Sequence, residues 1–183
     1  MTKKLIAIGT AVSLILGIVS VMLYHRFHDS VSLALAITFF TTFYHFAMRI
    51  FIASIVTLCR QKKEAADFTP FKIDKAEKGF YERIRVKKWK RYAPTYNKKL
   101  FDLKTTSYPA LMHHMINAEI GHKWIVVFSF LPILLAKPLD GWTPFLITSV
   151  LAAVFDLQFV IIQRYNRARL SELLIKMNVL REG

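Results

Sequence analysis

The chain has 183 residues, of which 54% are hydrophobic and 14% aromatic, and it carries a formal net charge of +14. A mean hydropathy of +0.35 is too high for a soluble domain with that much charge. The two properties are compatible if apolar residues form membrane spans and basic residues form the connections between them. A pI near 10.0 is typical of nucleic-acid-binding proteins. Here the separation of apolar spans from basic connections indicates that the basic residues face anionic lipid headgroups, and we expect no nucleic-acid partner. The single cysteine, Cys59, excludes an internal disulfide and a multi-cysteine metal site.

Two apolar runs near the N-terminus predict the first two spans, at residues 5–24 and 31–58, each long enough to cross a bilayer. No small-residue cleavage site follows the first run, so we expect it to remain in the protein. The second run contains His45 and Arg49, which are four residues apart and share one helix face. An arginine inside a span must face protein, water or a ligand. We expect His45 and Arg49 to bind substrate. The alternative is that Arg49 snorkels to the membrane surface or pairs structurally with a carboxylate of a neighbouring helix.

The character of the chain changes over residues 60–106, where basic residues greatly outnumber acidic ones. Within it, FYERIRVKKWK at 80–90 interleaves apolar residues with cations. That pattern is typical of an amphipathic segment lying at the cytoplasmic membrane surface. Its basic residues could bind a phosphorylated group, or they could simply be a solvated face.

A helix start is predicted at Ser107–Tyr108–Pro109, because proline is favoured in a first helical turn. Further along this helix, Glu119 and His122 are three residues apart and therefore lie on one face. A carboxylate beside an imidazole can orient it as a general base acting on a hydroxyl. The alternative is a structural salt link from Glu119 to Arg49 or to an arginine near the C-terminus. A metal site would need a second Glu-x-x-His motif, which the sequence lacks, so no metal is expected.

The remaining apolar runs predict spans at 122–137 and 143–163, joined by a turn with an interfacial tryptophan. Asp156 lies inside the last span and is a candidate for substrate binding, with Arg49 or His122 as possible partners. The last span ends in QRYNRARL at 163–170, and the residues after it can continue as an amphipathic helix. This stretch is either a positive anchor or a set of planar donors for an anionic group.

These segments predict an all-α membrane protein with about four transmembrane helices and a basic amphipathic cytoplasmic segment between the second and third. We expect a single membrane domain covering residues 1–183. Placing both termini in the cytoplasm puts the three basic regions on one side of the membrane, as the positive-inside rule requires.

Three stretches together resemble the glycosyl-4,4′-diaponeurosporenoate acyltransferase family: FYERIRVKKWK at 80–90, AEIGHKW at 118–124 and QRYNRARL at 163–170. The similarity covers about residues 80–174. It implies a protein of the bacterial cell membrane that attaches a fatty acyl group to the sugar of a glycosylated carotenoid. By this resemblance the site comprises Glu119, His122, Gln163, Arg164, Tyr165, Asn166, Arg167 and Arg169.

The expected function is therefore acyl transfer from acyl-CoA or a similar donor to a hydroxyl of a glycolipid or glycosylated carotenoid. His122 would act as the base, Glu119 would orient it, and arginine and amide donors would bind the substrates. We expect the acyl donor as a co-substrate and no tightly bound cofactor. The sequence contains no Gly-x-Ser-x-Gly nucleophile motif, so the site would be built differently from that of a serine hydrolase. The alternative is a non-catalytic membrane protein that binds lipid or acts as a scaffold, with the same residues forming a buried ion-pair network.

Overall fold

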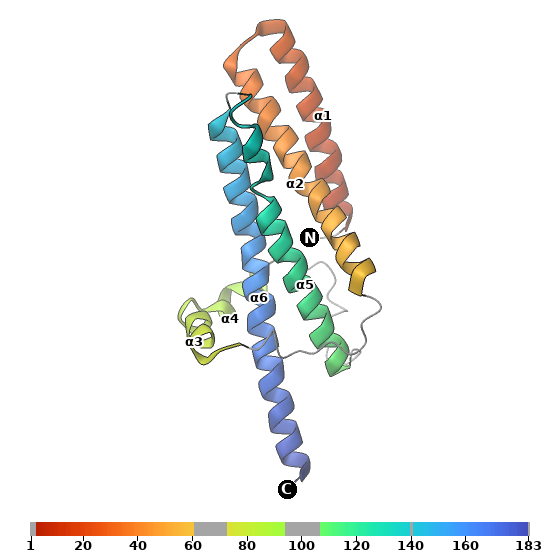
Figure 1. Ribbon diagram of the computed structural model, residues 1–183, viewed down its shortest axis with the longest axis vertical. Helices are drawn as coiled ribbons and strands as arrows, with labels where there is room; N and C mark the ends of the chain where they lie inside the picture. The colour runs from red at the N-terminus through yellow and green to blue at the C-terminus, as the bar shows by residue number, and fades with distance from the viewer. Residues whose placement is uncertain (1–2, 61–72, 94–106, 140, 183) are drawn as a thin grey trace. The chain divides into compact units, whose positions relative to one another are not determined.

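The structure is a computed structural model that describes residues 3–60, 73–93, 107–139 and 141–182. Within these ranges every regular element is helical, and no strand occurs (Figure 1). In chain order the elements are α1 (Lys3–Phe27), α2 (Ser30–Arg60), α3 (Lys75–Arg83), α4 (Val86–Trp89), η2 (Lys90–Tyr92), α5 (Tyr108–Phe128), η4 (Leu131–Leu135) and α6 (Trp142–Glu182).

In the part of the chain that the structure describes, four helical stretches are long and apolar enough to cross a membrane: Lys4–Phe27, Ser30–Cys59, Tyr108–Leu135 and Trp142–Leu173. Large apolar side chains on them are exposed, including Met22 at 66% and Leu134 at 74%. Such exposure is expected where lipid rather than water surrounds the helix. The structure confirms the predicted all-helical class with four apolar helices, and it indicates a multi-pass membrane protein.

The third apolar helix, α5, begins at Tyr108, ahead of the span predicted within it at 122–137, and the bounds of that span stay a prediction. The backbone N–H of Leu111 donates to the Ser107 carbonyl, which confirms the helix start predicted there. At its other end the α-helix stops at Phe128, and Pro132 follows inside the short 3₁₀ helix η4. Proline has no N–H and clashes with the preceding turn, so regular α-helix cannot continue through this position.

Contacts group the chain into two compact units, and we describe each by itself. The first unit comprises residues 1–55 and 123–156, and the second comprises residues 56–122 and 157–183. Three helices, α2, α5 and α6, each contribute to both units. The expectation of a single membrane domain stays a prediction.

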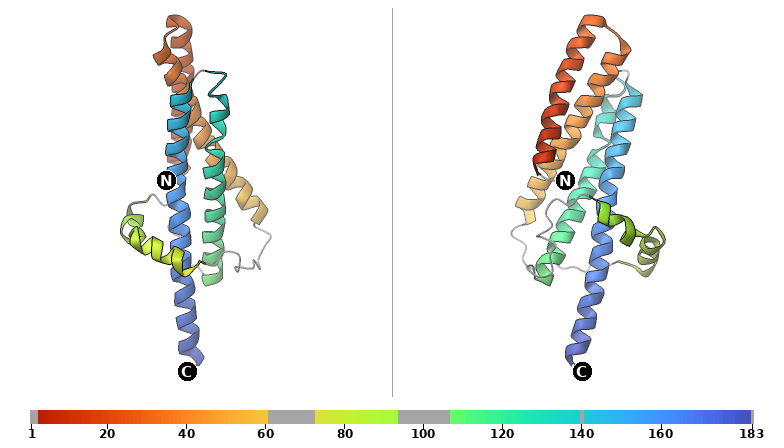
Figure 2. Two further views of the ribbon diagram at one scale, coloured as in Figure 1. Left: turned by 60° about the vertical axis from the view of Figure 1, so that its left-hand side comes forward. Right: turned by 180° about the vertical axis from the view of Figure 1, so that it is seen from behind.

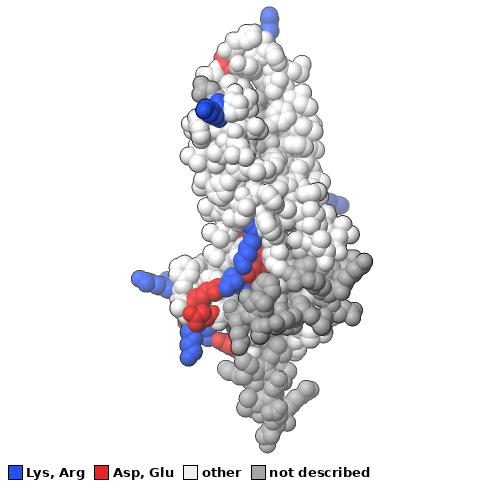
Figure 3. Space-filling model, viewed as in Figure 1, with Lys and Arg blue, Asp and Glu red and all other residues white. Residues whose placement is uncertain are grey.

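In the first unit α1 and α2 form an antiparallel pair (Figures 1 and 2). Gly9 and Gly17, on α1, allow close packing: a Cβ atom at these positions would lie 3.0 Å from the Phe46 ring and 3.2 Å from the Phe40 ring, respectively. Small residues of this kind let membrane helices approach closely. The surface of this pair in Figure 3 is white except for charged atoms near its ends, consistent with a lipid-facing exterior.

In the second unit α3 and α4 pack against α6 through an apolar cluster of Tyr81, Val86, Ile162 and Tyr165 (Figure 2). The apolar side of the predicted amphipathic segment therefore contacts protein. Residues 61–72 and 94–106, which flank this segment, lie outside the described ranges. On α5, Leu111, Met112, Met115 and Ile116 form a second cluster with Leu170 of α6.

Candidate functional site

The QRYNRARL stretch lies within α6, which continues as a helix to Glu182 as predicted. Its side chains divide between two neighbours in the second unit. Arg164 and Arg167 bond to the carboxylate of Glu119 on α5. Tyr165 packs into the cluster with α3 and α4. The stretch therefore joins α5, α6 and the α3–α4 segment, beyond any role as a membrane anchor.

Glu119 has no exposed surface, and its two carboxylate oxygens accept from different arginines. Arg164 Nη1 donates to one oxygen at 2.8 Å, and Arg167 Nη2 donates to the other at 2.5 Å. The structure thus confirms the predicted alternative of a salt link from Glu119 to C-terminal arginines. It also brings the predicted acid together with the arginine-rich stretch.

Glu77, on α3, is a member of this site that sequence reasoning missed. Arg164 donates to Glu77 through both Nε and Nη2, the latter at 2.6 Å, so all three of its nitrogens are engaged by the two carboxylates. The bond from Arg164 lowers the pKa of Glu77 below its ordinary value. Tyr81 also donates to Glu77, and burial together with this bond raises the pKa of Tyr81 to about 12. The only signal in the sequence was an acid in the first turn of a basic segment.

The resulting network is a chain of ion pairs that alternates in charge, with two carboxylates and two guanidinium groups in the order Glu77, Arg164, Glu119 and Arg167. Touching red and blue side chains form a patch over α3 and α6 in Figure 3. Because the four formal charges cancel, the network by itself presents no net positive charge to a substrate. Arg164 and Arg167 therefore differ from the freely available donors that the sequence suggested.

His122 is half-buried, and its ring stacks on Phe159 of α6 with centroids 4.8 Å apart and planes 17° apart. It lies one helical turn beyond Glu119 on α5. This stacking restrains the plane of the imidazole, which the sequence did not predict. The roles of Glu119 and His122 as orienting acid and base stay predictions.

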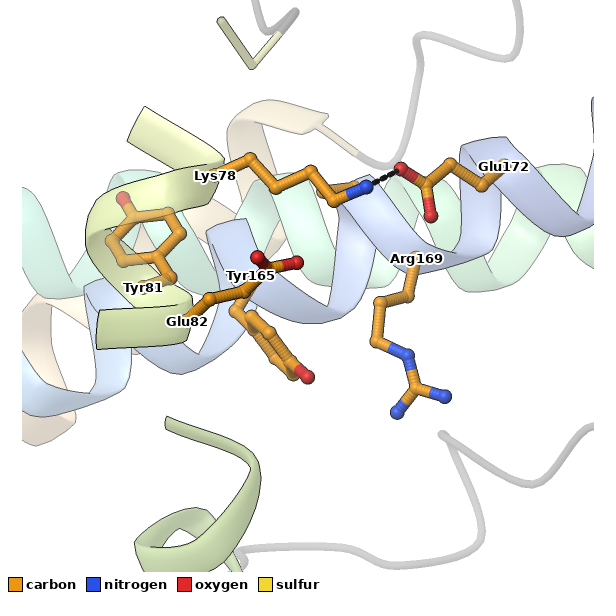
Figure 4. Close-up of a pocket in the computed structure, with 7 residues that line it drawn as sticks. Lys78, Tyr81, Glu82, Tyr165, Arg169 and Glu172 are labelled. Atoms are coloured by element: carbon orange, nitrogen blue, oxygen red, sulfur yellow. Dashed lines mark hydrogen bonds and ion pairs between the residues drawn. The ribbon is translucent and has the colours of Figure 1, made fainter. Parts of the chain in front are cut away.

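Two of the remaining motif residues, Tyr165 and Asn166, contact Lys90 of η2. Lys90 donates to the side-chain oxygen of Asn166, while Lys90 and Arg169 both lie against the ring of Tyr165. The buried amide oxygen of Gln163 has no partner among the described residues. A pocket in this region, shown in Figure 4, is lined by Lys78, Tyr81, Glu82, Tyr165, Ala168, Arg169 and Glu172.

The polar residues predicted inside the second and last spans, His45, Arg49 and Asp156, all belong to the first unit. Arg49 pairs with the fully buried Asp156 through Nη2 and, at 3.0 Å, through Nε. Its guanidinium also lies 5.2 Å from the centroid of the Phe155 ring. This confirms the structural pairing that was one expectation for Arg49, and it identifies Arg49 as a partner of Asp156. His45 is 4% exposed, and neither ring nitrogen has a partner among the described residues.

No group of three His, Cys, Asp or Glu side chains within the described ranges is placed to hold a metal ion. Cys59 is exposed and forms no disulfide.

The chain matches the family of glycosyl-4,4′-diaponeurosporenoate acyltransferases over residues 64–176, which is more than half of its length. The matched region contains Glu77, Glu119, His122, Asp156 and the QRYNRARL stretch, whereas His45 and Arg49 precede it. No curated protein and no solved structure matches the chain. The match thus spans the residues that build the network in the second unit, and the chain belongs to the glycosyl-4,4′-diaponeurosporenoate acyltransferase family.

Proposed function

We propose that this protein transfers a fatty acyl group from a thioester donor, such as acyl-CoA, to a hydroxyl of a glycosylated membrane lipid. Membership of the family supports acyl transfer, and the family description points to a glycosylated carotenoid as acceptor. The observation that carries the proposal is the meeting of buried Glu119 with Arg164 and Arg167, one helical turn from His122. Acid, imidazole and guanidinium groups are the parts that acyl transfer requires.

In the proposed reaction the acceptor hydroxyl oxygen attacks the carbonyl carbon of the thioester. Its proton passes to His122, the carbon–sulfur bond breaks, and His122 returns the proton to the departing thiolate. An ester and a free thiol are the products. Stacking on Phe159 restrains the imidazole, which favours a fixed direction of proton transfer.

Glu119 has a second role in this proposal, because its carboxylate holds Arg164 and Arg167 in place. The side-chain N–H groups of Gln163 and Asn166, and the guanidinium N–H groups that Arg164 does not donate to Glu77 or Glu119, would stabilise the charge that develops on the carbonyl oxygen. In the first unit, we propose that His45, Arg49 and Asp156 contact the lipid substrate.

We place both termini and the α3–α4 segment on the cytoplasmic side of a bacterial cell membrane. The basic N-terminus, the basic residues between α2 and α5, and the arginines of α6 then share one side. A thioester donor with a charged handle would reach the site from this side.

The charge balance of the network favours one alternative function. Two carboxylates and two guanidinium groups that satisfy one another are also what a structural clamp needs. In a non-catalytic lipid-binding or scaffold protein, the same four residues would hold α3, α5 and α6 together without contacting substrate.

The test is transfer of a labelled acyl group from acyl-CoA to extracted glycolipids by the purified protein in lipid nanodiscs. We expect His122→Ala to lower the rate about 100-fold or more, as loss of a general base does. His114→Ala removes a half-buried histidine from the same helix and should keep the rate. His122→Ala at full rate would remove the proposed base. A wild-type protein that binds glycolipid but forms no ester would favour the clamp.

A further inference from the structure

Two cations of the second unit gather around one aromatic ring. The ammonium of Lys90, on η2, lies 4.9 Å from the centroid of the Tyr165 ring. The guanidinium of Arg169, one helical turn after Tyr165 on α6, lies 5.9 Å from the same centroid. Segments far apart in the sequence therefore place two positive charges beside the same aromatic ring, that of Tyr165.

Among the residues whose side chains the structure describes, no carboxylate forms an ion pair with Lys90 or Arg169. The neighbouring Glu172 is engaged by Lys78, and Figure 4 shows the Arg169 guanidinium directed away from that pair. Within the described ranges, the Lys90 ammonium donates to the neutral side-chain oxygen of Asn166 and to no other group. This contrasts with the Glu77–Arg164–Glu119–Arg167 network, where the charges cancel.

The surroundings of Lys90 disfavour its own charge. Partial burial lowers the pKa of this ammonium, and the nearby cations Arg169 and Lys87 lower it further. Like charges held this close to each other cost free energy in the unoccupied protein. An anion bound between them would remove that cost, because it would pair with both cations at once.

We propose that Lys90 and Arg169, supported by the ring of Tyr165, form a binding site for a phosphate ester. Rigid support matters, because cations fixed on an aromatic face need less ordering when the ligand binds. The phosphate could belong to the nucleotide handle of a thioester donor or to the headgroup of an acidic phospholipid. The first source rests on the function proposed above, while the second does not.

A general solvated basic surface would not produce this arrangement. Lys88 and Arg83 belong to the same segment and are exposed, and in the described part of the chain neither forms an ion pair or lies over an aromatic ring. They provide matched controls, because their replacement removes the same charge from the same region without touching the Tyr165 platform.

The experiment has two arms, both with purified protein in phosphatidylcholine nanodiscs. The first arm measures the dissociation constant of coenzyme A, with pantetheine as the analogue that lacks the phosphates. The second arm measures how much the thermal midpoint rises when phosphatidylglycerol replaces part of the phosphatidylcholine. Each arm compares Lys90→Gln and Arg169→Gln with Lys88→Gln and Arg83→Gln.

We expect Lys90→Gln and Arg169→Gln either to weaken coenzyme A binding roughly tenfold or more, as loss of a charged hydrogen bond does, or to reduce the rise in thermal midpoint that phosphatidylglycerol produces. The control variants should bind like wild type. A change confined to coenzyme A identifies the donor handle, whereas a change confined to phosphatidylglycerol identifies the lipid headgroup. Lys90→Gln should also raise the midpoint of the ligand-free protein, because it removes the repulsion. The charge-preserving variants Lys90→Arg and Arg169→Lys should restore part of the binding.

The proposal is overturned if the two variants behave like their controls in both arms, or if wild type responds to neither phosphate. Acyl transfer is not needed for either measurement. Coenzyme A binding without ester formation would therefore refute the proposed function and leave this site standing. Ester formation together with unchanged binding in both variants would refute this site and leave the proposed function standing.

Discussion

Replacing Glu119 by glutamine tests whether this carboxylate holds the second unit together. Glu119 has no exposed surface, and the side chain of its partner Arg167 is only 4% exposed. Removing the carboxylate charge takes away the counter-charge of this buried guanidinium. Breaking a buried pair in this way costs about 3–5 kcal/mol. For a chain of this size, 1 kcal/mol corresponds to about 2–4 °C, so the midpoint of thermal unfolding should fall by roughly 6–20 °C.

The assay is thermal unfolding of purified protein in one detergent, followed by the fluorescence of its tryptophans. Glu82→Gln makes the same chemical change on an exposed carboxylate of α3 and should alter stability by less than about 0.5 kcal/mol. The double variant Glu119→Gln with Arg167→Gln should recover part of the loss, since it removes both members of one pair. If Glu119→Gln unfolds within 2 °C or so of the Glu82→Gln control, the buried network does not carry the stability assigned to it.

Three further changes test other parts of the chain. Arg49→Gln removes the arginine that pairs with buried Asp156 in the first unit, which should cost about 3–5 kcal/mol. Replacing both residues by leucine should restore most of the thermal midpoint, and a double variant as unstable as the single one would argue against the pairing. His45→Leu removes two unpartnered ring nitrogens and should raise stability by about 1–3 kcal/mol while lowering acyl transfer; increased stability with unchanged transfer would exclude a role in substrate binding. The lowered pKa of Glu77 means that its bond from Arg164 stabilises the fold above the ordinary carboxyl pKa and is lost as pH falls through the lowered value. Unfolding measured from about pH 6 to about pH 3 should therefore show a smaller loss of stability in Glu77→Gln than in wild type, and identical slopes would contradict this assignment.

Much of the fold could be predicted from the sequence because membrane spans follow a local rule. Backbone groups in lipid must bond within their own helix, so an apolar run of sufficient length specifies a helix wherever it lies. The start of α5 near Pro109 was equally local. Its end was less predictable, because Pro132 breaks the α-helix within a run that is apolar on both sides.

Helical spacing also indicated which residues share a face, and charge inside a span indicated which ones need a partner. Neither pattern identifies the partner itself. For Arg49 the sequence allowed a carboxylate or a ligand, and tertiary packing pairs it with Asp156.

Only the tertiary structure identified Glu77 as the second carboxylate for Arg164, across a separation of 87 residues. It also placed Lys90 and Arg169 on one aromatic ring and His122 on Phe159. The composition of a segment determines whether it can form an apolar helix. The choice among several arginines and several acids depends on which helix faces pack together, and that choice is made by contacts between residues distant in the sequence.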